Sequence, residues 1–319
     1  MNKKIKIALI GCGQWGKNIA RNLLEMKALM CVYDPESNQA KDFTLKNNLP
    51  DFSLNEIYLN KNIDGVVIAT SAHTHKDIAL EAIKNNKDVL IEKPFCLSVN
   101  DAEIISKNAV KKNRILMVGH LLNYHNAFIE MKKNINDGKI GSIKNIRAQR
   151  LALGSIRNIE SVIYDLSAHD ISMILSITKE LPIKVIAQSI HHNSNIGPDA
   201  ICATLFFSNG VTAFLNSDWM CPYKEHRFSV IGSKGSLIFD DTKDWNNKLE
   251  FNPSTINLDN TINYLPSNSL IIEKNEPLKK ELETFVNSIK SRKSPITNYE
   301  EALNVQKVME MIEINLDKN

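Results

Sequence analysis

The sequence predicts an α/β protein, with a doubly wound parallel sheet in its first 120 residues and an antiparallel or mixed sheet after them. Three observations predict this fold class. Strand-like and helix-like patterns alternate over residues 1–120, as in βαβ units. A glycine-rich turn separates the first strand from the first helix. Beyond residue 120, short strands are joined by hairpin turns. We therefore expect one domain over 1–120 and a second over 121–319, with the final helix able to pack back on the first.

The strands of the first domain are continuous apolar runs, as expected where both faces of a parallel sheet are covered. We expect strands over 5–11, 28–34, 64–70, 87–94 and 114–120, the fourth ending at Pro94. The segments between them are amphipathic, and we expect helices over 16–26, 39–48, 74–86 and 98–113. Ser98 or Asn100 is a suitable N-cap for the last of these helices.

The second domain begins with a helix over 127–141, closed by Gly138 or Gly141, and a strand over 142–154. A mainly apolar helix over 161–177 follows. Strands are then expected over 184–193, 201–219, 226–241 and 248–253, with "SNG" (208–210) and "SKG" (233–235) as hairpin turns. Helices over 276–291 and 298–316 close the chain.

Composition and charge exclude several functional classes. The 319 residues are 43% hydrophobic and 24% charged, which is typical of globular proteins, and the net charge of +3 is too small to indicate a nucleic-acid partner. No apolar run is long enough to span a membrane, and the amino-terminal one is too short for a signal peptide. The five cysteines are scattered without a Cys-x-x-Cys pair, so we expect a reducing, cytoplasmic location and no metal site.

The segment "GCGQWG" matches the dinucleotide-binding pattern G-x-G-x-x-G and stands between a strand and a helix, which is the context the pattern requires. Gly11 would allow the tight turn, Gly13 would let the backbone approach a pyrophosphate, and Gly16 would let helix and strand pack closely. The candidate cofactor contacts of this turn are Gly11, Gly13, Gln14, Trp15 and Gly16.

Asp34 ends the second strand, where an acidic side chain can accept hydrogen bonds from the adenosine ribose and repel a 2′-phosphate. The sequence therefore predicts NAD as cofactor, with NADP disfavoured. The alternative is that "YDPES" is only a polar turn after a strand.

"LIEKPF" places Lys93 at the carboxyl end of the fourth strand, the edge where open α/β sheets bind ligands. A lysine there can donate to a substrate hydroxyl or take its proton. The alternative is a surface lysine at a strand end.

"YDLSAHD" (164–170) places Asp165, His169 and Asp170 in an otherwise apolar segment. On an α-helix, Asp165 and His169 would lie one turn apart on one face. Histidine is suited to removing a proton near neutral pH, and a neighbouring carboxylate favours its charged form. The alternative is a structural Asp–His pair inside the core.

Together, "GCGQWG", "EKP" (92–94), "GKIGSI" (138–143) and D-x-x-x-H-D (165–170) resemble the glucose–fructose oxidoreductase / inositol dehydrogenase (Gfo/Idh/MocA) family over nearly the whole chain. The resemblance implies an amino-terminal Rossmann domain and a carboxy-terminal domain with an open, mostly antiparallel sheet often used in subunit contacts. It implies oxidation or reduction of a secondary alcohol on a sugar or cyclitol with a nicotinamide cofactor. It matches Lys93 to the family lysine, and Asp165 and His169 to the family Asp–His pair.

A narrower resemblance, carried by "GHLLNYHNAF", "RLALGSIRNIESVIYDLSAHDISMIL" and "SDWMCPYKEHRFSVIGSKG", is to the branch that oxidises C3 of UDP-N-acetylglucosamine. Asn126, Ser71 and Ala168 depart from this pattern, in loops near the expected site. Oxidation of a free sugar or cyclitol such as inositol therefore stays an alternative, and a non-catalytic dinucleotide-binding regulator is a more distant one.

We expect His169 as general base, Lys93 as the group that orients the hydroxyl and stabilises developing negative charge, and Asp165 as the orienting carboxylate. The assignment of the base between His169 and Lys93 stays open. Further candidates near the cofactor are Thr70, Ser71, His75 and Glu92, and further candidates for the substrate are His120, Tyr124, Arg150, Arg157, Trp219 and Lys224.

The two arginines and Lys224 suit the phosphates of a UDP-sugar, or are surface and salt-bridge residues. Tyr124 and His125 line a sugar pocket, or cap a helix and pack in the core. Trp219 stacks on a ring, or packs. His191 and His192 are expected to be structural. An exposed antiparallel sheet face also favours a homodimer or homotetramer.

Overall fold

The computed structural model describes residues 4–154, 157, 159–191, 197–257 and 259–316. Its contacts divide the chain into two compact units, Met1–Leu121 with Pro277–Gln306, and Leu122–Glu276 with Lys307–Asn319. The sequence-based domain boundary at residue 120 stays a prediction. His192 lies outside the described residues.

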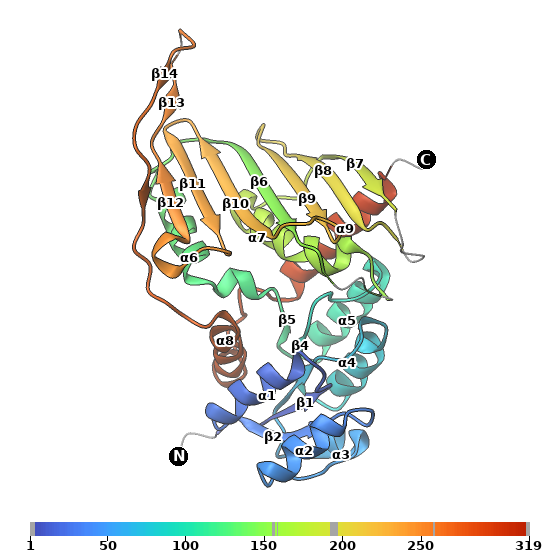
Figure 1. Cartoon of the computed structure of the whole chain (residues 1–319). Coiled ribbons are helices and arrows are strands. Elements are labelled where there is room, and N and C mark those ends of the chain that lie inside the picture. Colours follow the sequence, from blue (N-terminus) through green and yellow to red (C-terminus); the bar gives the residue numbers. More distant parts are fainter. Residues whose placement is uncertain (1–3, 155–156, 158, 192–196, 258, 317–319) are drawn as a thin grey trace. The chain divides into compact units, whose positions relative to one another are not determined.

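The first unit is built on a five-stranded parallel sheet with strand order β2-β1-β3-β4-β5 (Figure 1). Its strands are β1 (Ile7–Ile10), β2 (Leu29–Tyr33), β3 (Gly65–Ile68), β4 (Asp88–Ile91) and β5 (Leu116–Val118). All four pairings are parallel, which confirms the predicted doubly wound sheet. β1, β3, β4 and β5 are buried throughout, as their unbroken apolar runs predicted.

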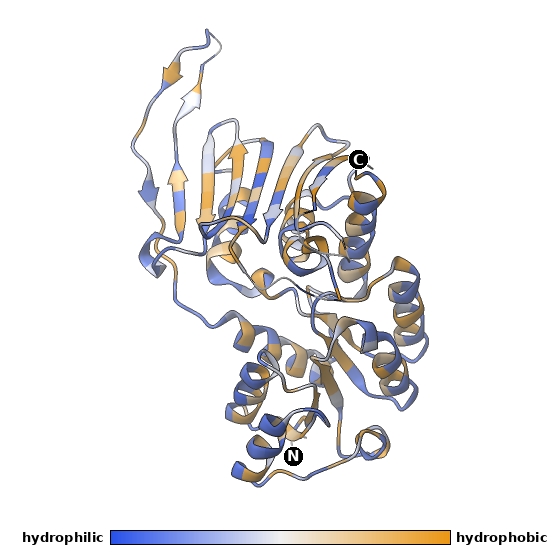
Figure 2. Cartoon of the chain, turned by 45° about the vertical axis from the view of Figure 1, so that its right-hand side comes forward, coloured by the Kyte–Doolittle hydropathy of each residue, from blue (hydrophilic) through white to orange (hydrophobic). Residues whose placement is uncertain are grey.

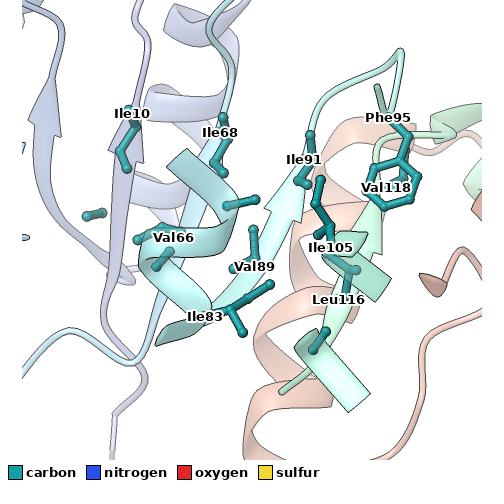
Figure 3. Close-up of a cluster of buried hydrophobic side chains, with 14 of the residues drawn as sticks. Ile10, Val66, Ile68, Ile83, Val89, Ile91, Phe95, Ile105, Leu116 and Val118 are labelled. Carbon is teal, nitrogen blue, oxygen red and sulfur yellow. The ribbon is translucent and has the colours of Figure 1, made fainter. Parts of the chain in front are cut away.

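Helices pack on both faces of this sheet. They are α1 (Gly16–Glu25), α2 (Asn38–Lys46), α3 (Leu54–Leu59), α4 (His75–Lys84), α5 (Val99–Lys111) and α8 (Pro277–Ser291), with the first half of α9 (Tyr299–Ile314). Ile83 of α4 and Ile105 of α5 belong to the same buried cluster as Val66 and Val89 of the sheet (Figure 3). Ile289 of α8 lies against the opposite side, beside Gly65.

The caps explain where these helices begin. Ser98 accepts a hydrogen bond from the backbone N–H of Asp101 and is the N-cap of α5, as one of the two predicted alternatives. The short helix α3 was not predicted. Its signal is a capping box, in which Ser53 and Glu56 each accept a hydrogen bond from the other's backbone N–H.

The second unit contains an eight-stranded sheet with order β15-β12-β11-β10-β6-β9-β8-β7. The strands are β6 (Ile143–Leu151), β7 (Lys184–Ile190), β8 (Ala200–Phe206), β9 (Thr212–Asp218), β10 (Glu225–Gly232), β11 (Gly235–Asp240), β12 (Leu249–Asn252) and β15 (Asn268–Ser269). β6 and β9 are parallel and the other pairs are antiparallel, so the sheet is mixed and mostly antiparallel, as expected. Buried residues alternate with more exposed ones along β9, and hydropathy alternates along the strands of this sheet in Figure 2.

Hairpin turns join these strands where glycines predicted them. Gly210 has φ +83° in the turn between β8 and β9, and Gly235 has φ +141° at the start of β11. Helix α6 (Asn126–Asn136) ends just before Gly138, which has φ +77°. A two-stranded hairpin, β13 (Thr255–Ile256) with β14 (Ile262–Asn263), was not predicted, because its strands are only two residues long.

The helix expected over 161–177 is only partly α-helical. Residues Ile163–Ser167 form a π-helical turn, and α7 (Ala168–Thr178) follows directly. A π-turn inserts an extra residue into the helical repeat, so Asp165 and His169 are not related by a simple α-helical turn. Tertiary bonds hold this turn, including a 2.9 Å hydrogen bond from the Ser167 hydroxyl to the Ser217 hydroxyl of β9. Among the described residues, no helix is long and apolar enough to cross a membrane.

Candidate functional site

The glycine turn after β1 has the geometry that a dinucleotide requires. Gly11 has φ +93°, and a Cβ there would lie 2.5 Å from the carbonyl of Ala69. A Cβ on Gly16 would lie 2.4 Å from the Gly11 carbonyl oxygen, so this glycine permits close packing of helix and strand. Nothing lies within 4 Å of a Cβ placed on Gly13, so the backbone there is open to a ligand. The turn leads into α1, whose amino-terminal N–H groups favour phosphate.

Asp34 is fixed at the end of β2 by the same turn. Its Oδ2 accepts a 2.7 Å hydrogen bond from the backbone N–H of Cys12, and its Oδ1 accepts one from the backbone N–H of Glu36. Burial, and then the charge of Asp34, raises the pKa of the Cys12 thiol, so this cysteine fills space rather than acting as a nucleophile. The carboxylate stands where ribose recognition needs it, and the turn fits an NAD molecule.

Glu92 and Trp15 connect the glycine turn to the end of β4. The indole N–H of Trp15 donates to Glu92 Oε1 over 2.9 Å, and the Lys93 backbone N–H donates to Oε2 over 3.3 Å. Burial raises the pKa of Glu92, and the hydrogen bond from Trp15 and the charge of Lys93 oppose that rise. Lys93, partly exposed next to this buried carboxylate, precedes a cis peptide bond to Pro94.

His75 contacts two loops of the first unit, one through Thr70 and the other through Pro94. Its Nδ1 lies 3.0 Å from the carbonyl oxygen of Pro94, and its Nε2 lies 3.1 Å from that of Thr70. Burial lowers the pKa of His75, although both carbonyls oppose the effect. Thr70 also shares a 2.7 Å hydrogen bond with the hydroxyl of Thr74, while Ser71 is exposed at the start of the following 3-10 turn. His75 therefore supports the loop that carries Lys93 rather than facing solvent.

His120, at the end of β5, is buried and bonded within the first unit. Its Nδ1 lies 2.8 Å from Oε2 of Glu301 on α9. This pairing leaves the other ring nitrogen as the one through which His120 could act on a substrate.

Asp165 is the centre of a buried polar group in the second unit. The indole N–H of Trp219 donates to Asp165 Oδ2 over 3.0 Å, and Arg157 Nε lies 3.5 Å from Oδ1. Trp219 is 2% exposed, so it packs in the core and orients this carboxylate instead of presenting a stacking face. The side chain of Arg157 is about half exposed, so its guanidinium contacts both Asp165 and solvent. His169 follows on the first turn of α7 and is partly exposed.

Arg150 and Asp170 form a buried ion pair. Both Arg150 Nε and Nη2 donate to the Asp170 carboxylate over 2.9 Å. Two arms of the guanidinium are thus occupied inside the unit. Asp170, which the sequence places in an otherwise apolar segment, is buried together with this partner, which offsets the cost of burying its charge.

Lys224 and Arg150 both lower the pKa of His226, a residue that was not predicted to belong to the site. Burial is the largest cause that lowers the pKa of His226, and the charges of Arg150 and Lys224 add to it, so that the pKa falls to about 4. His226 on β10 stands directly opposite Arg150 on β6. The only signal in the sequence was its place in "YKEHR", between a lysine and an arginine.

Tyr124 and His125 serve the fold of the second unit. His125 is the N-cap of α6, and its Nδ1 accepts a hydrogen bond from the backbone N–H of Ala127. Its ring stacks on that of Trp245, with the ring centroids 4.8 Å apart. Tyr124 is buried, and its carbonyl oxygen accepts a hydrogen bond from Asn275. His125 therefore caps a helix and packs in the core, which was the alternative to a place in a sugar pocket.

Two family models match the chain. One, described as "Oxidoreductase family, NAD-binding Rossmann fold", matches residues 5–120, and the other, described as "GFO/IDH/MocA C-terminal domain", matches residues 128–238. The chain belongs to the Gfo/Idh/MocA oxidoreductase family. The resemblance drawn from the sequence motifs is therefore confirmed, and so is NAD as cofactor. In the described residues, no group of His, Cys, Asp and Glu side chains is arranged to hold a metal ion.

Relatives within this family act on different substrates. The chain is 28% identical over 257 residues to 2,7-anhydro-N-acetylneuraminate hydratase of Escherichia coli (strain K12), covering 74% of this chain and 68% of that protein. It is 24% identical to myo-inositol 2-dehydrogenase of Thermotoga maritima, covering 93% and 92%. It is 26% identical to UDP-N-acetylglucosamine 3-dehydrogenase of Acidithiobacillus ferrooxidans, covering 66% of each.

A solved structure of the last enzyme shares the fold, with a TM-score of 0.85 and 22% identity over 98% of this chain and 97% of the other.

Proposed function

We propose that this protein oxidises a secondary alcohol on a nucleotide sugar, C3 of UDP-N-acetylglucosamine, to a ketone with NAD⁺. The reaction type is supported by the polar group around Asp165. There an indole N–H and an arginine hold a buried carboxylate, four residues before His169 in the sequence. Bound NAD⁺ supplies the acceptor for the hydride that leaves the alcohol carbon.

His169 takes the hydroxyl proton in this proposal. His169 follows the fixed carboxylate of Asp165 by four residues, and a carboxylate that contacts the imidazole would stabilise the imidazolium that forms. Asp165 is already held by Trp219 and Arg157, so it orients the imidazole without reorganising. In the same proposal, Lys93 donates to a substrate hydroxyl and stabilises the negative charge that develops on its oxygen.

A nucleotide sugar is favoured over a free sugar by the cations of the second unit. Arg157 is half exposed next to Asp165, and Lys224 is exposed on the segment that leads into β10. A pyrophosphate is attracted by such cations, whereas a neutral sugar gains little from them. The similarity to UDP-N-acetylglucosamine 3-dehydrogenase points the same way. The similarity to an inositol dehydrogenase keeps the free cyclitol as the second candidate.

The proposal is tested by following NADH formation with UDP-N-acetylglucosamine, N-acetylglucosamine and myo-inositol in parallel. We expect a signal with the nucleotide sugar alone. We also expect a loss of about 10²–10⁴-fold in Lys93→Met and His169→Asn, the range typical of an acid–base group. Lys107→Met and His191→Asn, which change the same residue types at exposed positions, serve as controls. A signal with inositol or the free sugar would overturn the substrate assignment.

A tightly held cofactor would give no net NADH. The same mixtures are therefore supplemented with 2-oxoglutarate as hydride acceptor, and the sugar product is analysed by mass for the loss of two hydrogens. An unchanged sugar under both conditions would reject the dehydrogenase proposal and favour a dinucleotide-binding regulator.

A further inference from the structure

Glu281, on α8, is a fully buried acid. Its side chain is 0% exposed, and within the part of the chain that the structure describes neither carboxyl oxygen has a hydrogen-bond partner. An ionised carboxylate in that position is costly, because neither water nor a donor replaces its hydration. The geometry alone therefore favours the neutral acid.

Two other acids face Glu281. The charges of Glu92, after β4, and Glu301, on α9, both add to burial in raising the pKa of Glu281 well above its ordinary value. We call these three residues the acid cluster. All of them belong to the first unit.

The other two members of the acid cluster have positive or polar neighbours. Glu301 is paired with His120, and Glu92 accepts from Trp15 and lies beside Lys93. Glu301 thus has a basic ring as its neighbour and Glu92 has the ammonium group of Lys93, whereas Glu281 has neither. A proton on Glu281 would neutralise the negative charge that no neighbour offsets.

Most of the other charged side chains of α8 and α1 are exposed, and Lys279 and Glu283 of α8 are half-buried. Helix α1 packs on α8, and its Lys17, Arg21 and Glu25 are exposed. Lys280, next to Glu281 on α8, is exposed as well. Solvent screens such charges, so they do not replace a buried counter-charge for Glu281.

We propose that Glu281 holds a proton in the cofactor-free protein and releases it when the positively charged oxidised nicotinamide binds, so that the acid cluster sets the relative affinity for NAD⁺ and NADH. The inference rests on the proposed function, since it takes the carboxyl edge of the parallel sheet, where Glu92 lies, as the nicotinamide edge. The oxidised ring carries one positive charge that the reduced ring lacks. It therefore supplies the counter-charge that Glu281 is missing.

The pH dependence of binding follows from linkage. If NAD⁺ binding releases a proton, the affinity for NAD⁺ rises with pH, by at most tenfold per pH unit for one whole proton. NADH brings no such charge, so its affinity changes less. The affinity for NAD⁺ relative to that for NADH therefore increases as the pH rises.

The experiment is calorimetric titration of the full-length protein with NAD⁺ or NADH, without sugar, in two buffers of different ionisation enthalpy. We expect proton release with NAD⁺, little with NADH, and loss of the difference in Glu281→Gln, which copies the neutral acid. Glu283→Gln, on the same helix, is the control that should behave as wild type. Equal proton release in wild type and Glu281→Gln, or none in wild type, would overturn the inference.

An infrared measurement on the wild type keeps the test decisive if Glu281→Gln does not fold. The carbonyl stretch of a protonated carboxylic acid should be present in the cofactor-free protein and decrease on addition of NAD⁺ but not NADH. A band unchanged by NAD⁺ would reject the proposal. Cofactor binding without proton release would leave the proposed sugar oxidation standing, whereas proton release without oxidation of any sugar would overturn only the proposed function.

Discussion

The indole N–H of Trp219 donates a 3.0 Å hydrogen bond to Oδ2 of Asp165, and both side chains are buried. The bond joins the segment after β9 to the π-helical turn before α7, which are far apart in sequence. The carboxylate is thereby held before any substrate arrives. Preorganised dipoles and charges of this kind act without reorganisation during a reaction.

Replacing Trp219 by Phe should keep the aromatic packing and remove the donor. A buried carboxylate that loses one hydrogen bond to a neutral donor is destabilised by about 1–3 kcal/mol. We expect a kcat at least severalfold lower, together with a fall of several degrees in Tm, measured by steady-state kinetics and thermal unfolding. Trp245→Phe is the matched control, because Trp245 stacks on His125 at the N-cap of α6. An unchanged kcat in Trp219→Phe would show that Asp165 does not depend on this bond.

Gly11 and Gly13 should respond differently to the same added methyl group. At Gly11 an alanine would require φ +93° and contact the Ala69 carbonyl, so Gly11→Ala should lower Tm and reduce the folded yield. At Gly13 the space is open, so Gly13→Ala should unfold at the wild-type temperature yet bind NADH more weakly, because the methyl group occupies the pyrophosphate approach. Thermal unfolding and NADH fluorescence titration measure the two effects. Equal NADH affinity in Gly13→Ala and wild type would place the pyrophosphate elsewhere.

The parallel sheet and the glycine turn could be predicted because their signals are local. Each strand is one apolar run, and the three glycines follow directly from β1. The π-helical turn could not be predicted, because its spacing depends on bonds such as Ser167 to Ser217, whose partners lie 50 residues apart. The four-residue spacing of Asp165 and His169 suggested an ordinary helix, and long-range contacts overrode that pattern.

The partners of the site residues were harder to predict than the residues themselves. Arg150 was predicted as a candidate phosphate ligand, but the fold places its guanidinium next to Asp170 of α7, to which it donates two hydrogen bonds. His75 appeared as a loop residue, yet it joins two carbonyl oxygens in the core. A sequence shows that a charged side chain is present, whereas the fold decides which neighbour satisfies it.

Acidification should destabilise the protein through two histidines, His125, which is buried, and His226, which is partly buried. The pKa of His125 and that of His226 are lowered to about 4, chiefly by burial, from an ordinary value of 6.5. Between these pH values the unfolded chain binds protons that the folded chain does not. The free energy of unfolding should therefore fall as the pH decreases from 6.5 toward 4, by at most about 1.4 kcal/mol per pH unit for each histidine.

Urea unfolding at a series of pH values measures this slope. His226→Gln should reduce it, because the variant has no proton to take up on unfolding. His73→Gln, at an exposed position, should leave it unchanged. If the slope in His226→Gln equals that of wild type, the acid sensitivity comes from other groups.

Asp34 should determine the choice between NAD and NADP. Its carboxylate is fixed by the backbone of Cys12, in the position where it can accept from the ribose hydroxyls and repel a 2′-phosphate. Asp34→Ser removes the charge, so NADH should bind roughly 10-fold more weakly or worse, since a hydrogen bond to a charged group contributes about 1.5–3 kcal/mol. NADPH should bind more tightly than it does to wild type, because the repulsion is gone. Fluorescence titration with both cofactors measures the ratio, and Glu36→Ser, two residues further on in the exposed turn, is the control. A ratio that shifts equally in both variants would mean that net charge, and not the position of Asp34, governs the selectivity.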